Sequence, residues 1–519
     1  MDTNWNLDNL YTSYESDKFL NDLENFEKVV KDFSKWCNDN FNSTQNTKEK
    51  LEIYLQKLND LSVFDSLIAY VYLNLKVDTT NSKLLNLSSK IEKIIVDVKQ
   101  IKNYVTLFLK DVNNLDNIIN SSDILKEYSF ILKEAKDKAD KLLDNDKEYI
   151  ISKMSLNGSN MWTKQWQQIT STLAVGYNNS VLTLPEIRNL AYDKDKDVRK
   201  EAYYSELKSY EKIDIPASFS INGIKGEVIE TCNMRGYSSP LEMTLKDSRL
   251  DKEVFEAMFS AIKESLPKLQ KYFIKKAELL GHKNGLPFYD LFAPISNNTK
   301  KYTYDEAKQF VYDNFSKFSQ KLGSFAKKAF DNNWIDVYSK KGKVGGAFCY
   351  SIQHIKESRI LLNFSGSLDN IFTLGHELGH GYHNLCLNNE KDVNTNYSMP
   401  IAETASTFCE HILVKSALES TSNEDEKLAI LENDLSGTLQ CIVDIYSRFL
   451  FEDEVFKRRN NGFVSKDELC DIMENAQKQA YGNGLDHNFL HKYMWICKTH
   501  YYNANANYYN FPYAYGVLF

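Results

Sequence analysis

The chain has 519 residues, a mass of 60.1 kDa, a formal net charge of −8 and an isoelectric point of about 5.7, so it is long enough for more than one domain and lacks the basic footprint of a nucleic-acid-binding protein. No apolar run approaches the ~18 residues of a membrane span, and residues 1–5 lack the basic and apolar regions of a signal peptide. Together with eight cysteines that show no paired spacing, this predicts a cytoplasmic protein with neither nucleic-acid nor membrane partners.

The first third of the chain is poor in residues that form tight turns. Its first glycine is Gly158 and its first proline is Pro185, so we expect long helices there. Apolar residues recur at helical spacing after Ser16, from Phe19 and Leu20 onward, and again over residues 84–101.

A polar segment divides this helical part from the rest. Residues 193–197 alternate Asp and Lys, which indicates either a domain boundary or the start of a helix. We expect an N-terminal helical domain over residues 1–190 and a second domain over residues 191–519.

Two short segments of the second domain favour β-structure. Glycines between Gly342 and Gly346 precede the apolar segment 347–352, which is typical of a turn entering a strand. The apolar run 359–364 indicates a buried strand that ends in a turn. An exposed edge strand here could pair with an extended peptide and hold its backbone, although a small structural hairpin explains the pattern equally well.

Residues 376–380, His-Glu-Leu-Gly-His, form the most informative pattern in the chain. Ser367 can cap a helix that contains them, so that His376 and His380 leave the same helical face one turn apart. Two imidazoles in this arrangement can converge on one metal ion while Glu377 lies beside them, as in a zinc peptidase. The pattern is expected by chance about 0.02 times in a chain of this composition, so the surrounding sequence must support it.

Three glycines, Gly375, Gly379 and Gly381, lie within this expected helix. Each costs about 1 kcal/mol relative to alanine in a helix interior. We therefore expect another backbone or a bound chain to pass close to the helix, with a merely loose helix as the alternative.

A catalytic zinc needs three protein ligands and an open position for water. The pattern that adds a third histidine on the same helix is excluded, because His383 and Cys386 occupy its positions. The segment 402–410 offers a carboxylate instead. We assign Glu403 to the metal and Glu410, on the same helical face, to a hydrogen bond with the far nitrogen of a ligand histidine. An ordinary solvated carboxylate remains an equal explanation for Glu410, and we expect His383 to be a packed residue and not a fourth ligand.

These residue types indicate a hydrolytic chemistry. Zinc lowers the pKa of its bound water toward ~7 and polarises a carbonyl, while Glu377 accepts the water proton and returns it to the leaving amine. The carbonyl oxygen then becomes negative and needs hydrogen-bond donors. Candidate donors lie in the segment 500–515, which contains His500 and six tyrosines where about one is expected from composition. A tyrosine-rich core is the alternative explanation for this segment.

Several segments together resemble the oligoendopeptidase F family of thimet-oligopeptidase-like metallopeptidases. The resemblance covers nearly the whole chain and is carried by residues 372–383, 402–406 and 509–513, and further by residues 5–11, 235–241 and 286–294. It implies two largely helical halves around a deep substrate channel. With the expected strands, this gives a mainly α fold that has a small β-sheet next to the zinc-binding helix.

The same resemblance implies a cytosolic zinc endopeptidase that cuts short, unfolded peptides and binds one Zn²⁺ per chain. The residues carried over by motif are, for the metal, His376, His380 and Glu403 and, for catalysis, Glu377, His500, Tyr509 and Tyr513. In this assignment Glu377 is the general base, and the imidazole and the two tyrosines orient the substrate and stabilise the oxyanion.

The chain departs from the family pattern near its end. The stretch 503–507 resembles an insertion within the tyrosine-rich motif and makes the alignment ambiguous, so Tyr501 or Tyr508 could hold a role that we assign to Tyr509 or Tyr513. Members of the family usually continue past this motif with further helices, which the second domain is expected to lack.

Two other classes of function stay open at this point. A zinc exopeptidase, of dipeptidase or carboxypeptidase type, must anchor a chain terminus with a charged group, and the sequence shows no motif for one. A peptide-binding protein with a structural metal is the second alternative, but such a site does not require Glu377. Mn²⁺ or Co²⁺ could occupy the same ligands.

Overall fold

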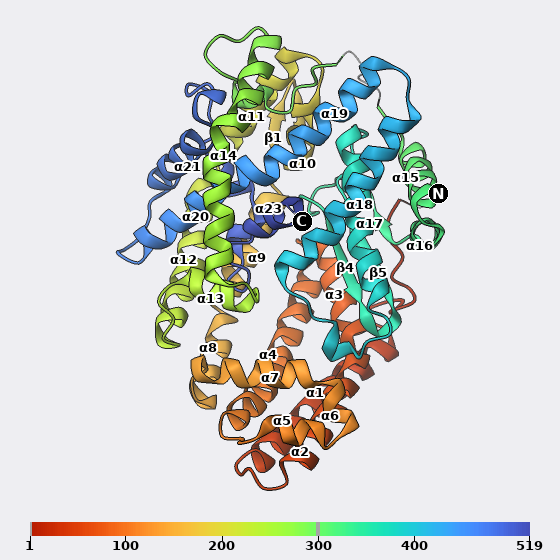
Figure 1. The fold of residues 1–519 in the computed structure, drawn as a ribbon, viewed down its shortest axis with the longest axis vertical. Helices are drawn as coiled ribbons and strands as arrows, with labels where there is room; N and C mark the ends of the chain where they lie inside the picture. Colours follow the sequence, from red (N-terminus) through yellow and green to blue (C-terminus); the bar gives the residue numbers. More distant parts are fainter. Residues whose placement is uncertain (1–2, 297–300, 519) are drawn as a thin grey trace.

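The computed structural model describes residues 3–296 and 301–518, and α-helices dominate the fold (Figure 1). The Ser16 hydroxyl accepts a hydrogen bond from the Phe19 amide at 3.3 Å and caps the first helix, as the sequence predicts. The apolar faces of the first helices pack into one core, which Ile352 and Leu361 from a later sheet complete. These helices are α1 (Asp17–Asn40), α2 (Thr47–Asp60), α3 (Asp65–Val77), α4 (Ser82–Lys110), α5 (Leu115–Asn120), α6 (Asp123–Glu127) and α7 (Ser129–Lys138). Helix α8 (Asn145–Ser155) follows them and packs against α4 outside this core.

A second group of helices comes from two distant parts of the chain. Its first part is α9 (Ser159–Ser171), β1 (Val175–Tyr177), β2 (Ser180–Leu182), α10 (Leu184–Asn189), α11 (Lys196–Tyr210), α12 (Asp214–Met234), α13 (Pro240–Asp247) and α14 (Lys252–Leu279). Its second part is α20 (Ile445–Arg459), α21 (Lys466–Tyr481), α22 (Met494–Cys497) and α23 (Phe511–Leu518). Both parts contribute to a single core, so the end of the chain returns to pack against helices that precede it by more than 200 residues.

The polar segment 193–197 leads into a helix. The carboxylate of Asp195 accepts a hydrogen bond from the Asp197 amide at 2.8 Å and caps α11. The domain boundary between residues 190 and 191 stays a prediction.

The third group surrounds a small sheet. Its elements are α15 (Tyr304–Phe318), α16 (Gln320–Asp331), β3 (Ile335–Asp336), β4 (Phe348–Ile352), β5 (Glu357–Leu361), α17 (Leu368–Cys386), α18 (Met399–Ser420) and α19 (Glu424–Leu439). The strand order is β3-β5-β4, with β3 parallel and β4 antiparallel to β5. Phe348 pairs with Leu361, and β4 is an edge strand that contacts α17.

These groups enclose a cavity of about 1240 Å³, lined by residues from all three of them. In Figure 1 the second group lies on the left, the third group on the right, and the first helices below them. The mainly α fold with a small sheet beside the helix that carries residues 376–380 is confirmed. Across the described residues, no helix combines the length and apolar character that crossing a membrane requires.

A wide turn of π-helix, residues 440–444, joins α19 to α20. Such turns insert an extra residue into a helix and are frequent at functional sites. Here Gln440, at the start of the turn, lines the cavity.

Candidate active site

Helix α17 presents one polar face to the cavity. Its start is fixed by Ser367, whose hydroxyl accepts a hydrogen bond from the Asn370 amide at 3.2 Å. The opposite face is apolar and packs into the core of the third group, because residues 371, 374 and 378 recur at helical spacing. The residues of α17 that line the cavity are Asn370, Thr373, His376, Glu377, His380 and Asn384.

Helix α18 passes very close to α17. A Cβ atom on Gly379 would lie 2.9 Å from the Cα atom of Ser406 and 2.9 Å from the Cβ atom of Cys409. The expectation that another backbone approaches this glycine-rich helix is therefore confirmed. Since Glu403 lies one turn before Ser406, the close packing brings its carboxylate next to the histidines of α17.

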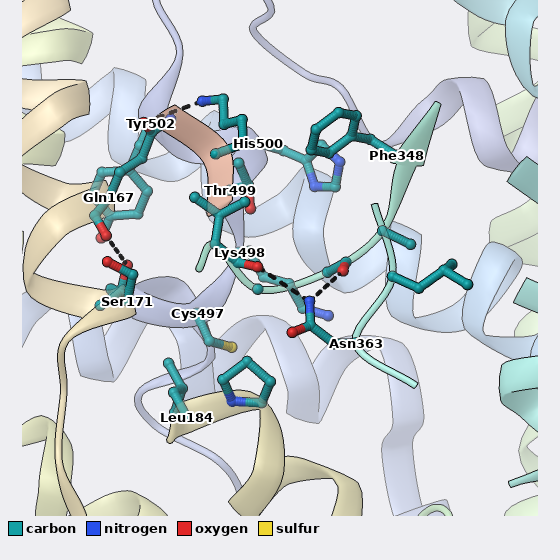
Figure 2. A pocket seen from close by; sticks show the side chains of 18 of the residues that line it. Gln167, Ser171, Leu184, Phe348, Asn363, Cys497, Lys498, Thr499, His500 and Tyr502 are labelled. Atoms are coloured by element: carbon teal, nitrogen blue, oxygen red, sulfur yellow. Dashed lines mark hydrogen bonds between the residues drawn. The ribbon is translucent and has the colours of Figure 1, made fainter. Parts of the chain in front are cut away.

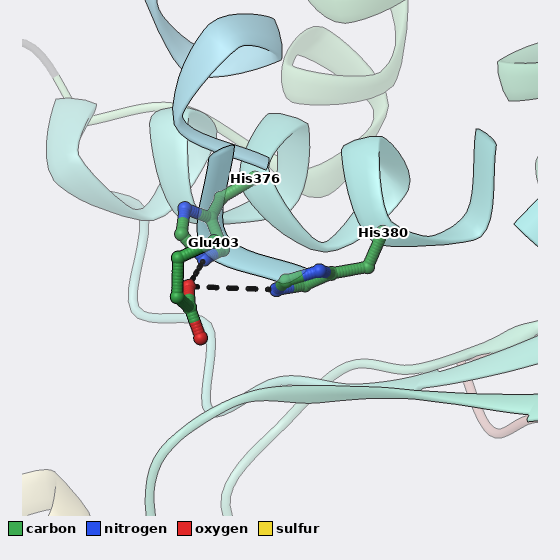
Figure 3. A group of neighbouring side chains, drawn as sticks. All are labelled: His376, His380 and Glu403. Carbon is green, nitrogen blue, oxygen red and sulfur yellow. Dashed lines mark ion pairs between the residues drawn. The ribbon is translucent and has the colours of Figure 1, made fainter. Parts of the chain in front are cut away.

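Figure 3 shows His376, His380 and Glu403 converging from these two helices. The Nε2 atoms of His376 and His380 lie 3.3 Å and 3.8 Å from the same oxygen, Oε2 of Glu403. The potential ligand atoms of the three side chains all lie within 4.8 Å of one another. Two imidazoles and one carboxylate form a donor set that suits a catalytic zinc, so these residues fit the metal that the sequence predicts.

The protonation states of this cluster also suit a cation. Burial alone would raise the pKa of Glu403, but the hydrogen bond and charge of His376 hold it at about 2, so the carboxylate is ionised. Burial and the neighbouring His376 lower the pKa of His380 to about 4, which keeps its imidazole neutral. Burial also opposes the charged form of His376, yet hydrogen bonds with Glu403 and Glu410 raise its pKa well above the usual value. A bound cation would take the place of the proton that these hydrogen bonds keep on His376.

Glu377 lines the same cavity, and one of its carboxylate oxygens is left for a ligand. Its side chain is 6% exposed, and its Oε2 atom has no hydrogen-bond partner among the described residues. Burial, reinforced by the charges of Glu403 and Glu410 against the opposing charge of His376, raises its pKa to about 7. A carboxylate with a pKa near the working pH can both accept and return a proton.

Two further predicted residues flank the histidines. Oε2 of Glu410 lies 3.2 Å from Nδ1 of His376, where it can fix the orientation of this ring. His383 instead stacks on Tyr397 at 4.3 Å between ring centroids and does not belong to the cluster of potential metal ligands.

The tyrosine-rich end of the chain completes the site. The Tyr509 hydroxyl donates a hydrogen bond to Oε1 of Glu403 at 2.9 Å, and the Tyr513 hydroxyl lies 3.2 Å from Nε2 of His500. The rings of His500 and Tyr509 are parallel, with centroids 5.1 Å apart. Burial and the nearby Arg448 lower the pKa of His500 to about 3, so its imidazole is neutral.

The structure separates the four tyrosines that the sequence left as alternatives. Tyr509 and Tyr513 line the cavity. Tyr508 instead donates a hydrogen bond to Asp453 at 3.1 Å and packs in the core of the second group. Tyr501 lies in the same core, against Phe451.

Sequence reasoning missed Tyr397 as a residue of the site. It lines the cavity, and its hydroxyl donates a hydrogen bond to Asn384 at 3.2 Å. A single tyrosine that precedes a helix carries no spacing signal, so only the packing of His383 against its ring reveals it.

The edge strand β4 borders the cavity. Figure 2 shows Phe348 and Asn363 on one side of the pocket and Gln167 and Ser171 on the other. The Asn363 amide donates hydrogen bonds to the carbonyl oxygens of Val344 and Gly346, which holds the glycine-rich turn in front of the strand.

Comparison with known proteins gives consistent matches. A model of the family described as Peptidase family M3 matches residues 189–517. Oligopeptidase PepF of Bacillus subtilis is 24% identical over 99% of this chain and 77% of its own length. Group B oligopeptidase PepB of Streptococcus agalactiae is 29% identical over 64% of this chain and 55% of its own length. The crystal structure of oligoendopeptidase-F from Enterococcus faecium matches with a TM-score of 0.69 at 17% identity, covering 96% of this chain and 86% of that one, which shows a shared fold.

Proposed function

Because the chain belongs to peptidase family M3, which makes it a metallopeptidase, we propose that it is a zinc-dependent endopeptidase that hydrolyses internal bonds of short, unfolded peptides. One observation carries this proposal. His376, His380 and Glu403 converge within 4.8 Å at the wall of a large cavity, and Glu377, whose Oε2 atom has no partner in the part of the chain that the structure describes, lies beside them. We further propose that the protein acts in the cytoplasm on peptides that are already unfolded.

The metal would be held by His376, His380 and Glu403. When bound, zinc supplies Lewis acidity, which polarises the scissile carbonyl and makes a water molecule more acidic. Oε1 of Glu403 accepts the Tyr509 hydrogen bond, so its other oxygen stays directed at the two histidines.

Glu377 would move the proton. Burial raises the pKa of its carboxyl group above the ordinary value, so the carboxylate can take a proton from the attacking water and then donate it to the nitrogen of the leaving amine. Its burial excludes competing water and keeps the proton available for the second transfer.

Tyr513 and His500 would stabilise the negative charge on the carbonyl oxygen. When Nε2 of His500 carries the proton, this nitrogen donates to the Tyr513 oxygen, and the Tyr513 hydroxyl hydrogen is then free to reach the substrate. A donor fixed in advance in this way is worth about 10²–10³ in kcat.

The shape of the cavity supports cleavage of peptides and not of folded proteins. A cavity of about 1240 Å³ accepts an extended segment but no folded domain. The edge strand β4 can add such a segment by backbone hydrogen bonds, which do not depend on the side chains of the substrate. The matched relatives from Bacillus subtilis and Streptococcus agalactiae are both named oligopeptidases.

The test of this proposal is the Glu377→Gln variant. We expect the variant to keep the zinc content of the unchanged protein, measured by elemental analysis, and to lose at least about 10²-fold in kcat on an internally quenched peptide with both ends blocked. Full activity of the variant would reject the role of Glu377. Hydrolysis of free dipeptides in place of the blocked peptide would indicate an exopeptidase.

A further inference from the structure

Six lysine and arginine side chains line the cavity, and most of them already have a partner. Four form ion pairs with carboxylates: Lys164 with Glu92 at 2.8 Å, Arg188 with Glu206 at 3.0 Å, Arg199 with Asp290 at 2.7 Å and Arg448 with Asp444 at 2.5 Å. A fifth, Lys76, donates a hydrogen bond to the amide oxygen of Gln167 at 3.2 Å.

Lys498 is different. Its ammonium group has neither a hydrogen bond nor an ion pair within the part of the chain that the structure describes. It follows Cys497 and precedes Thr499 and His500, which all line the same pocket (Figure 2). A half-buried cation two residues from His500 therefore faces the space that a substrate would fill.

The surroundings of Lys498 leave one positive charge uncompensated. Arg448 and Arg188 are close enough to lower the pKa of Lys498. The charge of Asp444 favours the ammonium, but this carboxylate is already paired with Arg448, as Glu206 is with Arg188, so three cations share two carboxylates. Burial, helped by Arg448, lowers the pKa of Lys498 to about 8, so the ammonium remains mostly charged at neutral pH. An unpaired charge in such a place is costly, and an anionic ligand would relieve that cost.

We propose that Lys498 forms a carboxylate-binding subsite of the channel, which holds either the C-terminal carboxylate or an acidic side chain of the bound peptide. This inference rests on the proposed peptidase function. Because a lysine is a point charge on a flexible stem, it can follow the carboxylates of peptides that differ in length by a residue or so. A peptide held at both Lys498 and the edge strand β4 would be cut at a restricted distance from the bound carboxylate.

The experiment measures equilibrium binding in the Glu377→Gln background, so that its result does not depend on turnover. The probes are fluorescent, N-acetylated peptides without acidic residues that end either in a free carboxylate or in an amide. We expect the free acid to bind at least about tenfold more tightly, the size of one charge-assisted hydrogen bond. If the two bind equally, amidated peptides with Glu or Gln at successive positions test the side-chain source, and equal binding in that series as well overturns the subsite.

Two variants assign the preference to one side chain. In Lys498→Met the ratio of the two affinities should fall to near one, and Lys498→Arg should restore part of it. Lys164→Met removes the same charge from the same pocket, but from an ammonium already paired with Glu92, and should keep the preference. A preference that survives in folded Lys498→Met, checked by its circular dichroism spectrum, would contradict the proposal. If the Glu377→Gln protein with Lys498 unchanged bound none of the peptides, that result would instead reject the peptidase function itself.

Discussion

At the scale of single residues, Tyr509 and Tyr513 lie next to each other but meet different partners. Tyr509 donates its hydroxyl hydrogen to Glu403, whereas Tyr513 contacts the neutral imidazole of His500. The first tyrosine therefore acts on a metal ligand, and the second has a hydroxyl that can turn toward the substrate. The two side chains are chemically identical but have different functions, which substitution of each tyrosine by phenylalanine can separate.

We expect Tyr513→Phe to lower kcat by about 10²-fold with little change in KM, because only a donor to the developing oxyanion is lost. Tyr509→Phe should instead weaken zinc binding by about 10- to 100-fold, since the orientation of Glu403 is no longer fixed. Steady-state kinetics and competition with a chelator measure the two effects.

Tyr508→Phe is the matched control for both tyrosine variants. It removes a hydroxyl that donates to Asp453 outside the cavity, and it should leave kcat and zinc affinity unchanged. If Tyr513→Phe retained the kcat of the unchanged protein, the role of oxyanion donor would belong to another group.

At the scale of secondary-structure elements, the metal ligands depend on how closely α17 and α18 pack. The absent side chain of Gly379 allows the backbone of α18 to approach, and Gly516 lets α23 approach Glu403 in the same way, since a Cβ there would lie 3.1 Å from the Glu403 carbonyl oxygen. The three ligands thus sit where glycines let α17 and α23 pack closely against α18. We infer that this packing explains why the helix tolerates residues of poor helical propensity.

We expect Gly379→Ala to destabilise the fold by about 1–3 kcal/mol and to reduce zinc affinity, because the added methyl group must push α18 and Glu403 away from the histidines. Gly437→Ala is the control, since a Cβ on this glycine of α19 would meet its nearest neighbour, Oε1 of Glu410 on α18, at an ordinary contact distance of 3.9 Å. This second change should stabilise the protein by up to about 1 kcal/mol. Urea unfolding compares the two variants, and equal stabilisation by both would show that the helices do not limit each other at Gly379.

The elements that carry the metal ligands were predictable because their signals are local. Ser16 and Ser367 cap helices where the sequence places them, and the spacing of His376 and His380 fixes their common face. The burial predicted for the apolar residues after Ser16 is wrong at the edge of the helical face, because Leu20 is 50% exposed. Periodicity identifies the apolar face of a helix, but the position of the neighbouring helix determines how much of that face is buried.

At the scale of the whole molecule, the contacts that complete the site join distant parts of the sequence. The sequence identifies the tyrosine-rich segment, but it cannot show that the chain reverses at Tyr508, where φ is +52°, and so turns Tyr509 into the cavity. Lys498 likewise stands out only when its neighbours from other helices are known to be paired. Long-range pairing leaves no periodic signal in one sequence, and this limits what can be predicted.

A buried ion pair fastens this C-terminal segment to the helices of the second group. The Lys225 ammonium, in a residue with 0% exposure, donates to Oε1 of Glu452 at 2.6 Å and to the Asn507 side chain at 3.0 Å. The Asn510 amide donates to the other oxygen of Glu452 at 3.1 Å. The network therefore joins α12 and α20 to the residues on either side of Tyr508 and Tyr509.

We expect Lys225→Met to destabilise the protein by about 3–5 kcal/mol, because the Glu452 carboxylate is left buried without a counter-charge. The double variant Lys225→Met with Glu452→Gln should be less destabilised, since no charge remains buried. Lys31→Met removes an ammonium from an exposed pair with Glu27 and should leave the urea midpoint unchanged. Both Lys225 variants should also lower kcat more than they raise KM, because the loop that positions Tyr509 and Tyr513 loses its anchor. Unchanged kcat in a folded but destabilised Lys225→Met would show that the ion pair supports the fold without positioning the tyrosines.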